Sequence, residues 1–310
     1  IIDAPSLKIK AIYPNKTKIL LLGIFGSFLF ILSILFFIEY LDNTIKTEDE
    51  IEKYGLTRLG LIPRINFEEI KQVLQTNGEN SPSENLLRLV AQFHPQAIAT
   101  ESYRALRTSI IFQRKKNLNA KTFLFTSCGP QEGKTTTVLN TATVFAQSGL
   151  KTIVIDADLR RPMIHSVFNL RKERGLTDVL MDDQPIEHVI KSTVVHNLFV
   201  ITSGILPPNP SELLALNRVT DFIEDLKPHF DLIIFDTPPL IPVTDAIVLS
   251  DYVDFSILVV RAKKTDRDMI SDAIQKFKTH KNNLIGVVLN DFDFERHYGY
   301  KYQNYSYYKT

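Results

Sequence analysis

Short apolar runs alternate with stretches of helical period along the chain from residue 121 onward. The runs are rich in Val, Ile, Leu and Phe, which is typical of strands that are buried on both faces of a sheet. Helical patterns cover residues 136–148, which end at Gly149 as a left-handed cap, and residues 211–226, which end before Pro228. The alternation predicts an α/β fold, a mostly parallel sheet with helices on both faces. The predicted strands are residues 122–126, 152–155, 198–202, 232–235, 255–260 and 284–289.

Residues 19–38 (ILLLGIFGSFLFILSILFFI) show a second pattern, twenty residues without a charge. A helix of that length spans about 30 Å, the thickness of the hydrocarbon core of a bilayer. A buried core helix usually carries a polar stripe, and a signal peptide ends in a small-residue cleavage site, whereas Glu39 opens a charged stretch here. The pattern therefore predicts a transmembrane helix.

Composition excludes some classes of function. The chain has 310 residues, of which 44% are hydrophobic and 23% charged, and its net charge of +1 provides no overall field for nucleic acid. The single cysteine, Cys128, excludes a disulfide framework and fits a reducing compartment. Because the first residue is Ile1 rather than Met, we interpret the chain as part of a longer protein whose front is missing.

A phosphate-binding loop is the most specific motif. The strand at residues 122–126 leads into SCGPQEGKT (residues 127–135), and a helical pattern follows. Backbone N–H groups in such a loop surround phosphates, and the helix N-terminus adds its positive dipole. Lys134 would reach the β- and γ-phosphates and the Thr135 hydroxyl would bind Mg²⁺, although Cys128 stands where the strict motif has Gly. The predicted ATP-binding residues are Gly129, Pro130, Glu132, Gly133, Lys134, Thr135 and Thr136.

Three aspartates come at the ends of predicted strands, where ligands of parallel sheets bind. Asp156 and Asp158 follow residues 152–155, and Asp236 follows residues 232–235. An aspartate at a strand end often caps a helix, but near a phosphate loop it could hold Mg²⁺ or accept a proton. We predict a metal site of Thr135, Asp158 and Asp236, and catalytic roles for Lys134, Asp156 and Asp158.

Six of the eleven tyrosines lie in the last thirteen residues, without the period of a packed helix or strand. Together with a nucleotide site, these phenols suggest a kinase that phosphorylates copies of itself. An aromatic adhesion segment is the alternative, and it would tolerate Tyr→Phe changes. The predicted phosphoacceptors are Tyr298, Tyr300, Tyr302, Tyr305, Tyr307 and Tyr308.

Two signals disagree about membrane orientation. The lysines before the apolar span would, by the positive-inside rule, put the N-terminal side in the cytosol. The nucleotide site argues for the opposite orientation, because ATP is cytosolic, and we follow the nucleotide site. The lysines are Lys8, Lys10, Lys16 and Lys18.

Three segments resemble the bacterial tyrosine kinases of the polysaccharide copolymerase family. IVIDADLR (residues 153–160) resembles their second Walker A-type motif, and LIIFDTP (residues 232–238) resembles their Walker B motif. ESYRALR (residues 101–107) matches their E-x-x-R-x-x-R oligomerisation motif, although a solvated helix face would show the same spacing. The related deviant Walker ATPases carry an extra lysine where this chain has Gly129, which favours the kinases. The oligomerisation motif consists of Glu101, Arg104 and Arg107.

The resemblance covers essentially the whole chain and implies a P-loop NTPase-type fold with ATP and Mg²⁺ as cofactors. It implies phosphorylation in trans within a ring-shaped homo-oligomer, with Asp156 as the first candidate to take the phenol proton and Asp158 as the second. Arg160 and Arg161 could neutralise phosphate or meet a neighbouring subunit. The implied role is control of exopolysaccharide or capsule polymerisation and export.

The resemblance also implies a location and partners. The chain would lie in the inner membrane with its kinase domain in the cytoplasm. Its partners would be a cognate tyrosine phosphatase, polysaccharide polymerase and export proteins, and the membrane, but no nucleic acid. The expected parts are an extracytoplasmic juxtamembrane segment (residues 1–18), the transmembrane helix (19–38), a cytoplasmic linker region (39–95), the kinase domain (96–296) and the tyrosine-rich tail (297–310).

Alternative interpretations remain for the function of the chain and for the role of Asn290. The chain could be an ATPase switch that controls oligomerisation without tyrosine transfer, or a scaffold with vestigial nucleotide binding. The tyrosine tail argues against the switch, and the intact Lys134 and Thr135 argue against the scaffold. Asn290 sits where related nucleotide proteins read adenine, but a strand-end turn with Asp291 explains it equally well.

Overall fold

The computed structural model describes residues 15–68, 70–71, 83–115, 117, 119–182, 184–280 and 283–294. The chain divides into two compact units, Ile1–Asn43 and Thr44–Thr310. The predicted tyrosine acceptors in the tail, and the lysines at positions 8 and 10, lie outside the described residues.

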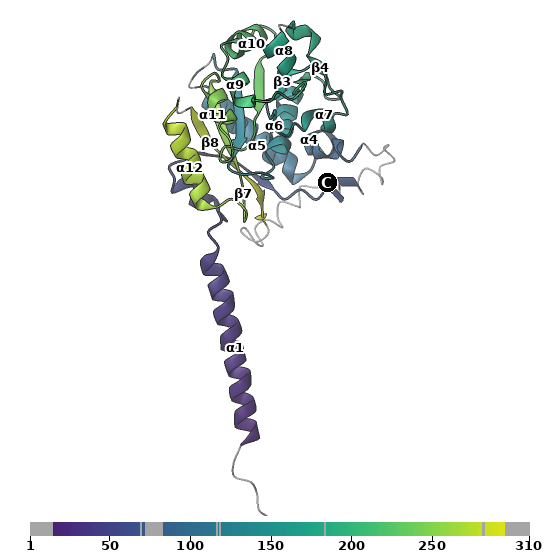
Figure 1. Cartoon of the computed structure of the whole chain (residues 1–310). Helices are drawn as coiled ribbons and strands as arrows, with labels where there is room; N and C mark the ends of the chain where they lie inside the picture. Colours follow the sequence, from purple (N-terminus) through teal and green to yellow (C-terminus); the bar gives the residue numbers. More distant parts are fainter. Residues whose placement is uncertain are drawn as a thin grey trace, which may run out of the picture. The chain divides into compact units, whose positions relative to one another are not determined.

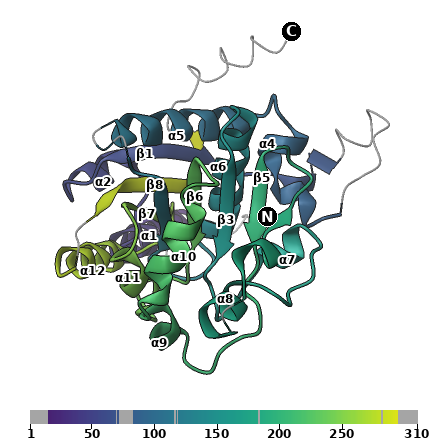
Figure 2. The ribbon, with the colours of Figure 1, turned by 90° about the horizontal axis from the view of Figure 1, so that it is seen from above.

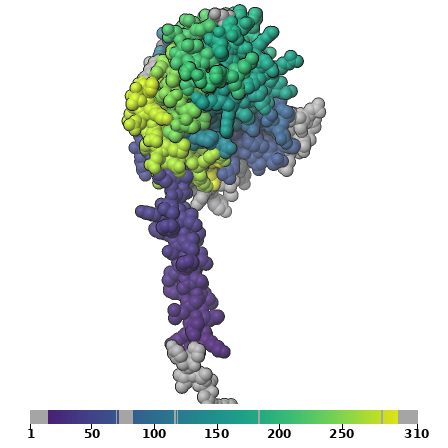
Figure 3. Space-filling model, viewed as in Figure 1, coloured from purple at the N-terminus to yellow at the C-terminus, as the bar shows by residue number. Residues whose placement is uncertain are grey.

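The first unit contains one long helix, α1 (Lys16–Leu41). The Asn15 side chain caps its start by accepting from the Lys18 N–H at 3.3 Å. None of its residues is buried, and its side chains form the surface of the helix along its length (Figure 3). The helix extends the predicted apolar span by three residues at each end, and its length and composition suffice to cross a membrane.

Eight strands among the described residues form one sheet in the order β1-β8-β7-β2-β6-β3-β5-β4. Strands β7 and β8 are labelled beside helix α12 in Figure 1. All neighbours pair in parallel except β4 and β5, which pair antiparallel. The six predicted strands are all present, which confirms the predicted α/β fold with a mostly parallel sheet. The strands are β1 (Arg58–Pro63), β2 (Thr122–Ser127), β3 (Thr152–Asp156), β4 (Lys191–Ser192), β5 (Leu198–Ile201), β6 (Leu232–Asp236), β7 (Phe255–Arg261) and β8 (Leu284–Phe292).

Helices cover both faces of this sheet, and each face has its own apolar core because successive strand residues point to opposite sides. Figure 2 shows α5 and α6 on one side of the sheet and α10, α11 and α12 on the other. The first side has α4 (Val90–Phe93), α5 (Ile98–Arg114), α6 (Lys134–Gln147) and α7 (Ile164–Val167). The second side has α2 (Glu48–Glu52), α8 (Leu176–Asp182), α9 (Pro210–Leu214), α10 (Arg218–Leu226), α11 (Asp245–Ser250) and α12 (Arg267–Lys278). Two short 3₁₀ helices are η1 (Leu86–Arg88) and η2 (Ile186–His188).

The predicted helix at residues 211–226 is wrong in one respect, because it is divided into α9 and α10. Asn217, a poor helix former, occupies the N-cap of α10. The hydroxyl of Tyr252 donates to the Ala215 carbonyl at 3.0 Å and so satisfies the end of α9 from outside the helix.

Strand β1 lies within residues 39–95, the expected linker region. It pairs in parallel with β8, and the second compact unit comprises Thr44–Thr310. Gly60 and Pro63 obscure the strand pattern, since both residues are depleted in strands. Gly60 is needed there because a Cβ would lie 3.2 Å from the Leu106 side chain of α5.

Candidate active site

The phosphate loop lies between the end of β2 at Ser127 and the start of α6 at Lys134. Its chain direction reverses through two residues in the left-handed region, Gln131 (φ 60°) and Gly133 (φ 85°). Gly133 is also required sterically, because a Cβ there would lie 1.9 Å from the Asn290 amide nitrogen. The backbone N–H groups of the loop and the positive end of the α6 dipole therefore meet at one point. This arrangement suits a phosphate.

Lys134, Thr135 and Asp236 converge at the helix start. The Lys134 Nζ lies 2.5 Å from Asp236 Oδ1 and 3.8 Å from Asp158 Oδ2. The Thr135 hydroxyl donates to Asp236 Oδ2 at 2.7 Å. Burial raises the pKa of the Asp236 carboxyl, while the Lys134 ammonium opposes that rise. The structure thus brings four predicted site residues together: Lys134 and Thr135 at the start of α6, Asp236 at the end of β6, and Asp158 just beyond the end of β3.

The oxygen atoms at this point suit Mg²⁺. A hydroxyl from Thr135 and carboxylates from Asp158 and Asp236 are the hard ligands that Mg²⁺ prefers. Among the described residues, no group of three His, Cys, Asp or Glu side chains could hold a metal ion by itself. In nucleotide sites Mg²⁺ commonly takes its remaining ligands from water and phosphates.

Asp156 occupies a different environment from the one that its predicted role requires. Its side chain has no exposed surface, and Oδ2 accepts from the backbone N–H groups of Met163 (3.1 Å) and Ile164 (3.0 Å). Burial first, and the neighbouring Asp236 second, raise the pKa of Asp156 to about 8. Because the side chain has no exposed surface and Oδ2 is bonded to the backbone, a phenol has no direct access to this carboxyl. Its visible role is to fix the start of α7.

Asp158 is the better-placed carboxylate of the pair. It keeps 8% exposure, its Oδ1 accepts from the Arg161 N–H at 2.9 Å, and its Oδ2 faces Lys134. The geometry therefore favours Asp158 over Asp156 as the proton acceptor.

The remaining predicted loop residues differ in exposure. Pro130 is exposed, whereas Gly129 and Glu132 are buried. Glu132 turns inward, where Oε2 accepts from the Gly129 N–H at 3.0 Å. Thr136 lies half-buried in the first turn of α6, and its carbonyl accepts from the Asn140 amide at 2.9 Å. Glu132 thus shapes the loop rather than facing a ligand.

Two polar residues near the site are already engaged within the chain. The Arg160 guanidinium makes two hydrogen bonds to the fully buried Asp245, at 2.8 and 3.0 Å. The Asn290 amide donates to the Glu132 carbonyl at 2.9 Å, so this side chain supports the phosphate loop. Sequence reasoning missed Asp245, whose only signal is its place after Thr244 at a helix start.

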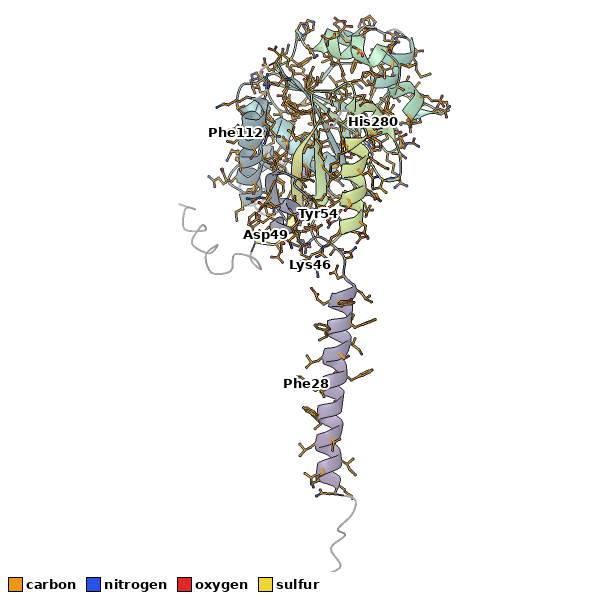
Figure 4. All side chains as sticks on the ribbon, turned by 90° about the vertical axis from the view of Figure 1, so that its left-hand side faces the viewer. Phe28, Lys46, Asp49, Tyr54, Phe112 and His280 are labelled. Atoms are coloured by element: carbon orange, nitrogen blue, oxygen red, sulfur yellow. The ribbon has the colours of Figure 1, made fainter. Side chains whose placement is uncertain are left out.

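The predicted oligomerisation motif lies on α5. Glu101 and Arg104 form an ion pair, and Glu101 is exposed. Arg107 instead donates to the Val144 carbonyl of α6 at 2.8 Å, within the same chain. Farther along α5, Phe112 is 65% exposed and points outward (Figure 4). The motif residues therefore divide between the exposed surface and an internal helix–helix contact.

The folded unit offers few phenol groups for phosphorylation among its described residues. The hydroxyls of Tyr54 and Tyr252 donate to the carbonyls of Arg267 (3.4 Å) and Ala215 (3.0 Å). Tyr103 is completely buried, and burial raises its pKa.

A parallel sheet with a phosphate loop between β2 and α6, and aspartates at the ends of β3 and β6, defines a nucleotide-binding fold of the P-loop NTPase type. A family model described as "AAA domain" matches residues 131–287. The chain belongs to the bacterial tyrosine kinases of the polysaccharide copolymerase type, and it is a protein-tyrosine kinase.

Similar proteins named as tyrosine kinases support the assignment to this family. Tyrosine-protein kinase YwqD of Bacillus subtilis is 37% identical over 224 residues, which cover 72% of this chain and 94% of the relative. Tyrosine-protein kinase ptk of Acinetobacter johnsonii is 36% identical over 295 residues, which cover 94% of this chain but only 39% of the relative. The chain thus spans about two-fifths of that longer kinase. The solved kinase domain of Escherichia coli tyrosine kinase ETK superposes with a TM-score of 0.71 at 32% identity, covering 80% of this chain and 95% of that one.

Proposed function

We propose that the chain transfers the γ-phosphate of ATP to the six tail tyrosines of a neighbouring copy. The observation that carries this proposal is the convergence of Lys134, Thr135, Asp158 and Asp236 at the end of the phosphate loop. The engaged or buried hydroxyls of Tyr54, Tyr103 and Tyr252 support acceptors other than these three tyrosines.

Each residue has a distinct role in the proposed transfer. The phenol oxygen bonds to the γ-phosphorus, the bond from that phosphorus to the ADP oxygen breaks, and the phenol proton passes to Asp158. Lys134 neutralises the phosphate oxygens as charge shifts toward ADP. Thr135 and Asp236 would hold Mg²⁺, which supplies further charge neutralisation when bound. The loop N–H groups and the α6 dipole orient the phosphates.

We further propose a regulatory setting for this reaction. The apolar helix α1 lies in the inner membrane, the kinase unit lies in the cytoplasm, and copies associate in a ring through Glu101 and Arg104 on α5. Each phosphate adds roughly −1.5 to −2 charges to a tail. Several phosphates on neighbouring tails repel one another, which loosens the ring. Cycling between these states, with a cognate phosphatase, controls polysaccharide polymerisation and export.

A phosphotyrosine assay tests the transfer. The full chain in detergent is incubated with Mg-ATP, beside a Lys134→Met variant and a variant with all six tail tyrosines changed to Phe. We expect phosphotyrosine only in the parent, with Lys134→Met at least about 100-fold slower. ATP hydrolysis without phosphotyrosine in the parent would contradict the proposal and favour the ATPase switch.

A mixing experiment tests transfer between copies. The six-Tyr→Phe variant supplies an intact active site, and Lys134→Met supplies intact tails. We expect the mixture to label the Lys134→Met tails, whereas each variant alone stays unlabelled. No labelling in the mixture, with a labelled parent, would show that each copy modifies only itself.

A further inference from the structure

Glu132 presents an electrostatic problem within the phosphate loop. It is a carboxylate, only 2% exposed, in a loop whose proposed ligand is a polyphosphate. Two like charges a few ångströms apart repel more strongly in a poorly solvated site than in water. The carboxylate must therefore be held in one direction for the loop to accept phosphate.

The segment between β7 and α12 provides that restraint. The Thr265 hydroxyl donates to Glu132 Oε1 at 2.5 Å and accepts from the Arg261 N–H at 2.9 Å. Thr265 is completely buried. Its hydroxyl therefore has both its donor and acceptor capacity used, and it has one preferred orientation.

The backbone around Thr265 is also fixed. Its carbonyl accepts from the Ile45 N–H at 2.9 Å, and the Lys263 N–H donates to the Ile45 carbonyl at 2.7 Å. Ile45 is itself fully buried. The hydroxyl is thus anchored by the main chain on one side and by Glu132 on the other.

Further contacts from the same segment reach the loop tip. The Arg261 guanidinium donates to the Gln131 carbonyl at 3.1 Å, and the Lys264 ammonium donates to the same atom at 3.3 Å. These two contacts are solvent-exposed, so they are weak restraints. The Thr265–Glu132 hydrogen bond is the stronger one, because it is shielded from water. Burial raises the pKa of the Glu132 carboxyl, and this hydrogen bond opposes that rise by stabilising the carboxylate.

We propose that Thr265 is a positioning residue for nucleotide binding, which holds the Glu132 carboxylate on the Gly129 N–H and away from the incoming phosphates. This inference rests on the proposed binding of ATP at the loop. Thr265 is completely buried and is not among the residues proposed to contact nucleotide or tyrosine. It acts through Glu132, so its loss should weaken nucleotide binding more than it slows transfer at saturating ATP.

Calorimetric titration of the full chain in detergent with Mg-ADP tests the inference. We expect Thr265→Val, which keeps the shape but loses the hydroxyl, to raise the Kd about tenfold. Thr265→Ser, which retains the hydroxyl, should bind within about twofold of the parent. In the phosphotyrosine assay, Thr265→Val should raise the KM for ATP while kcat at saturation changes less than about twofold.

A double variant separates positioning from general packing. In a Glu132→Ala background no carboxylate needs restraint, so adding Thr265→Val should leave the Kd unchanged. An equal tenfold loss in both backgrounds, or parent-like binding by Thr265→Val, would overturn the inference. If Thr265→Val does not fold, the comparison of Thr265→Ser with Thr265→Ala decides in the same way.

The two proposals fail differently. If the parent itself does not bind Mg-ADP, the proposed function fails at the loop. If the parent binds Mg-ADP and Thr265→Val binds it equally well, only the role of Thr265 fails.

Discussion

Asp156 and Asp236 lie directly opposite each other in register at the ends of the adjacent parallel strands β3 and β6. Both are essentially buried, and Asp236 contributes, after burial, to the raised pKa of Asp156. Lys134 makes its hydrogen bond to Asp236 rather than to Asp156. The two carboxyl groups therefore have different roles. Asp236 lies at the phosphate loop, whereas Asp156 retains its proton and holds the start of α7.

This division predicts a pH-dependent difference between the parent and Asp156→Asn. Below pH about 4 the carboxyl is protonated in both the folded and the unfolded chain, so its titration changes nothing. Between pH about 4 and about 8 the unfolded chain releases the proton that the folded chain retains, which favours unfolding. The free energy of unfolding of the parent should thus fall relative to Asp156→Asn as pH rises through this range.

Urea unfolding of both proteins at intervals from pH 4 to pH 9 measures that difference. A gap that stays constant over the whole range would show that Asp156 is ionised in the folded protein at neutral pH. Asp225→Asn serves as a control, since Asp225 is exposed on α10.

Gly133→Ala should disable the loop for two separable reasons. The new Cβ would meet the Asn290 amide, and the left-handed backbone is strained for Ala, at a cost of roughly 1–3 kcal/mol. We expect lower stability and loss of measurable nucleotide binding. Adding Asn290→Ala removes the clash but not the strain, so the double variant should recover part of the stability. Full recovery would mean that the backbone strain is unimportant.

The motif on α5 should separate into folding and association effects. Arg107→Ala removes a charged donor from the Val144 carbonyl, and we expect a loss of about 1–3 kcal/mol in the free energy of unfolding. Arg104→Ala breaks an exposed ion pair with Glu101 and an exposed hydrogen bond to the Pro95 carbonyl (3.1 Å), so it should cost less stability than Arg107→Ala. Sedimentation velocity should show weaker association for Arg104→Ala even though it remains fully folded. Equal loss of stability in both variants would contradict this separation.

Phe112 should contribute to the same self-association surface. It is a large exposed apolar side chain on the helix that carries Glu101 and Arg104. We expect Phe112→Ser to shift the sedimentation profile toward smaller species. Met181→Ser is the matched control, because Met181 is 56% exposed on α8, on the other side of the sheet. Identical shifts for both variants would indicate nonspecific association.

The sequence predicted the sheet and the phosphate loop well because both depend on local patterns. Buried strands read as apolar runs, and Gly133-Lys134-Thr135 sits between a strand and a helix. The sequence could not distinguish the role of Asp156 from that of Asp158, because the burial of a side chain at a strand end depends on the elements that pack over it. Thr265 was missed because its partner Glu132 lies 133 residues away along the chain.

Strand β1 closes the edge of β8, a strand of nine residues that would otherwise present unpaired backbone groups. A kinase fragment cut at residue 96 would therefore expose an adhesive edge. Two such fragments could pair strand to strand and mimic a dimer in solution. Association measured on that fragment would come from the β8 edge exposed by the truncation. A fragment that starts at Thr44 keeps β1 in place, so its association would instead come from the surface of α5.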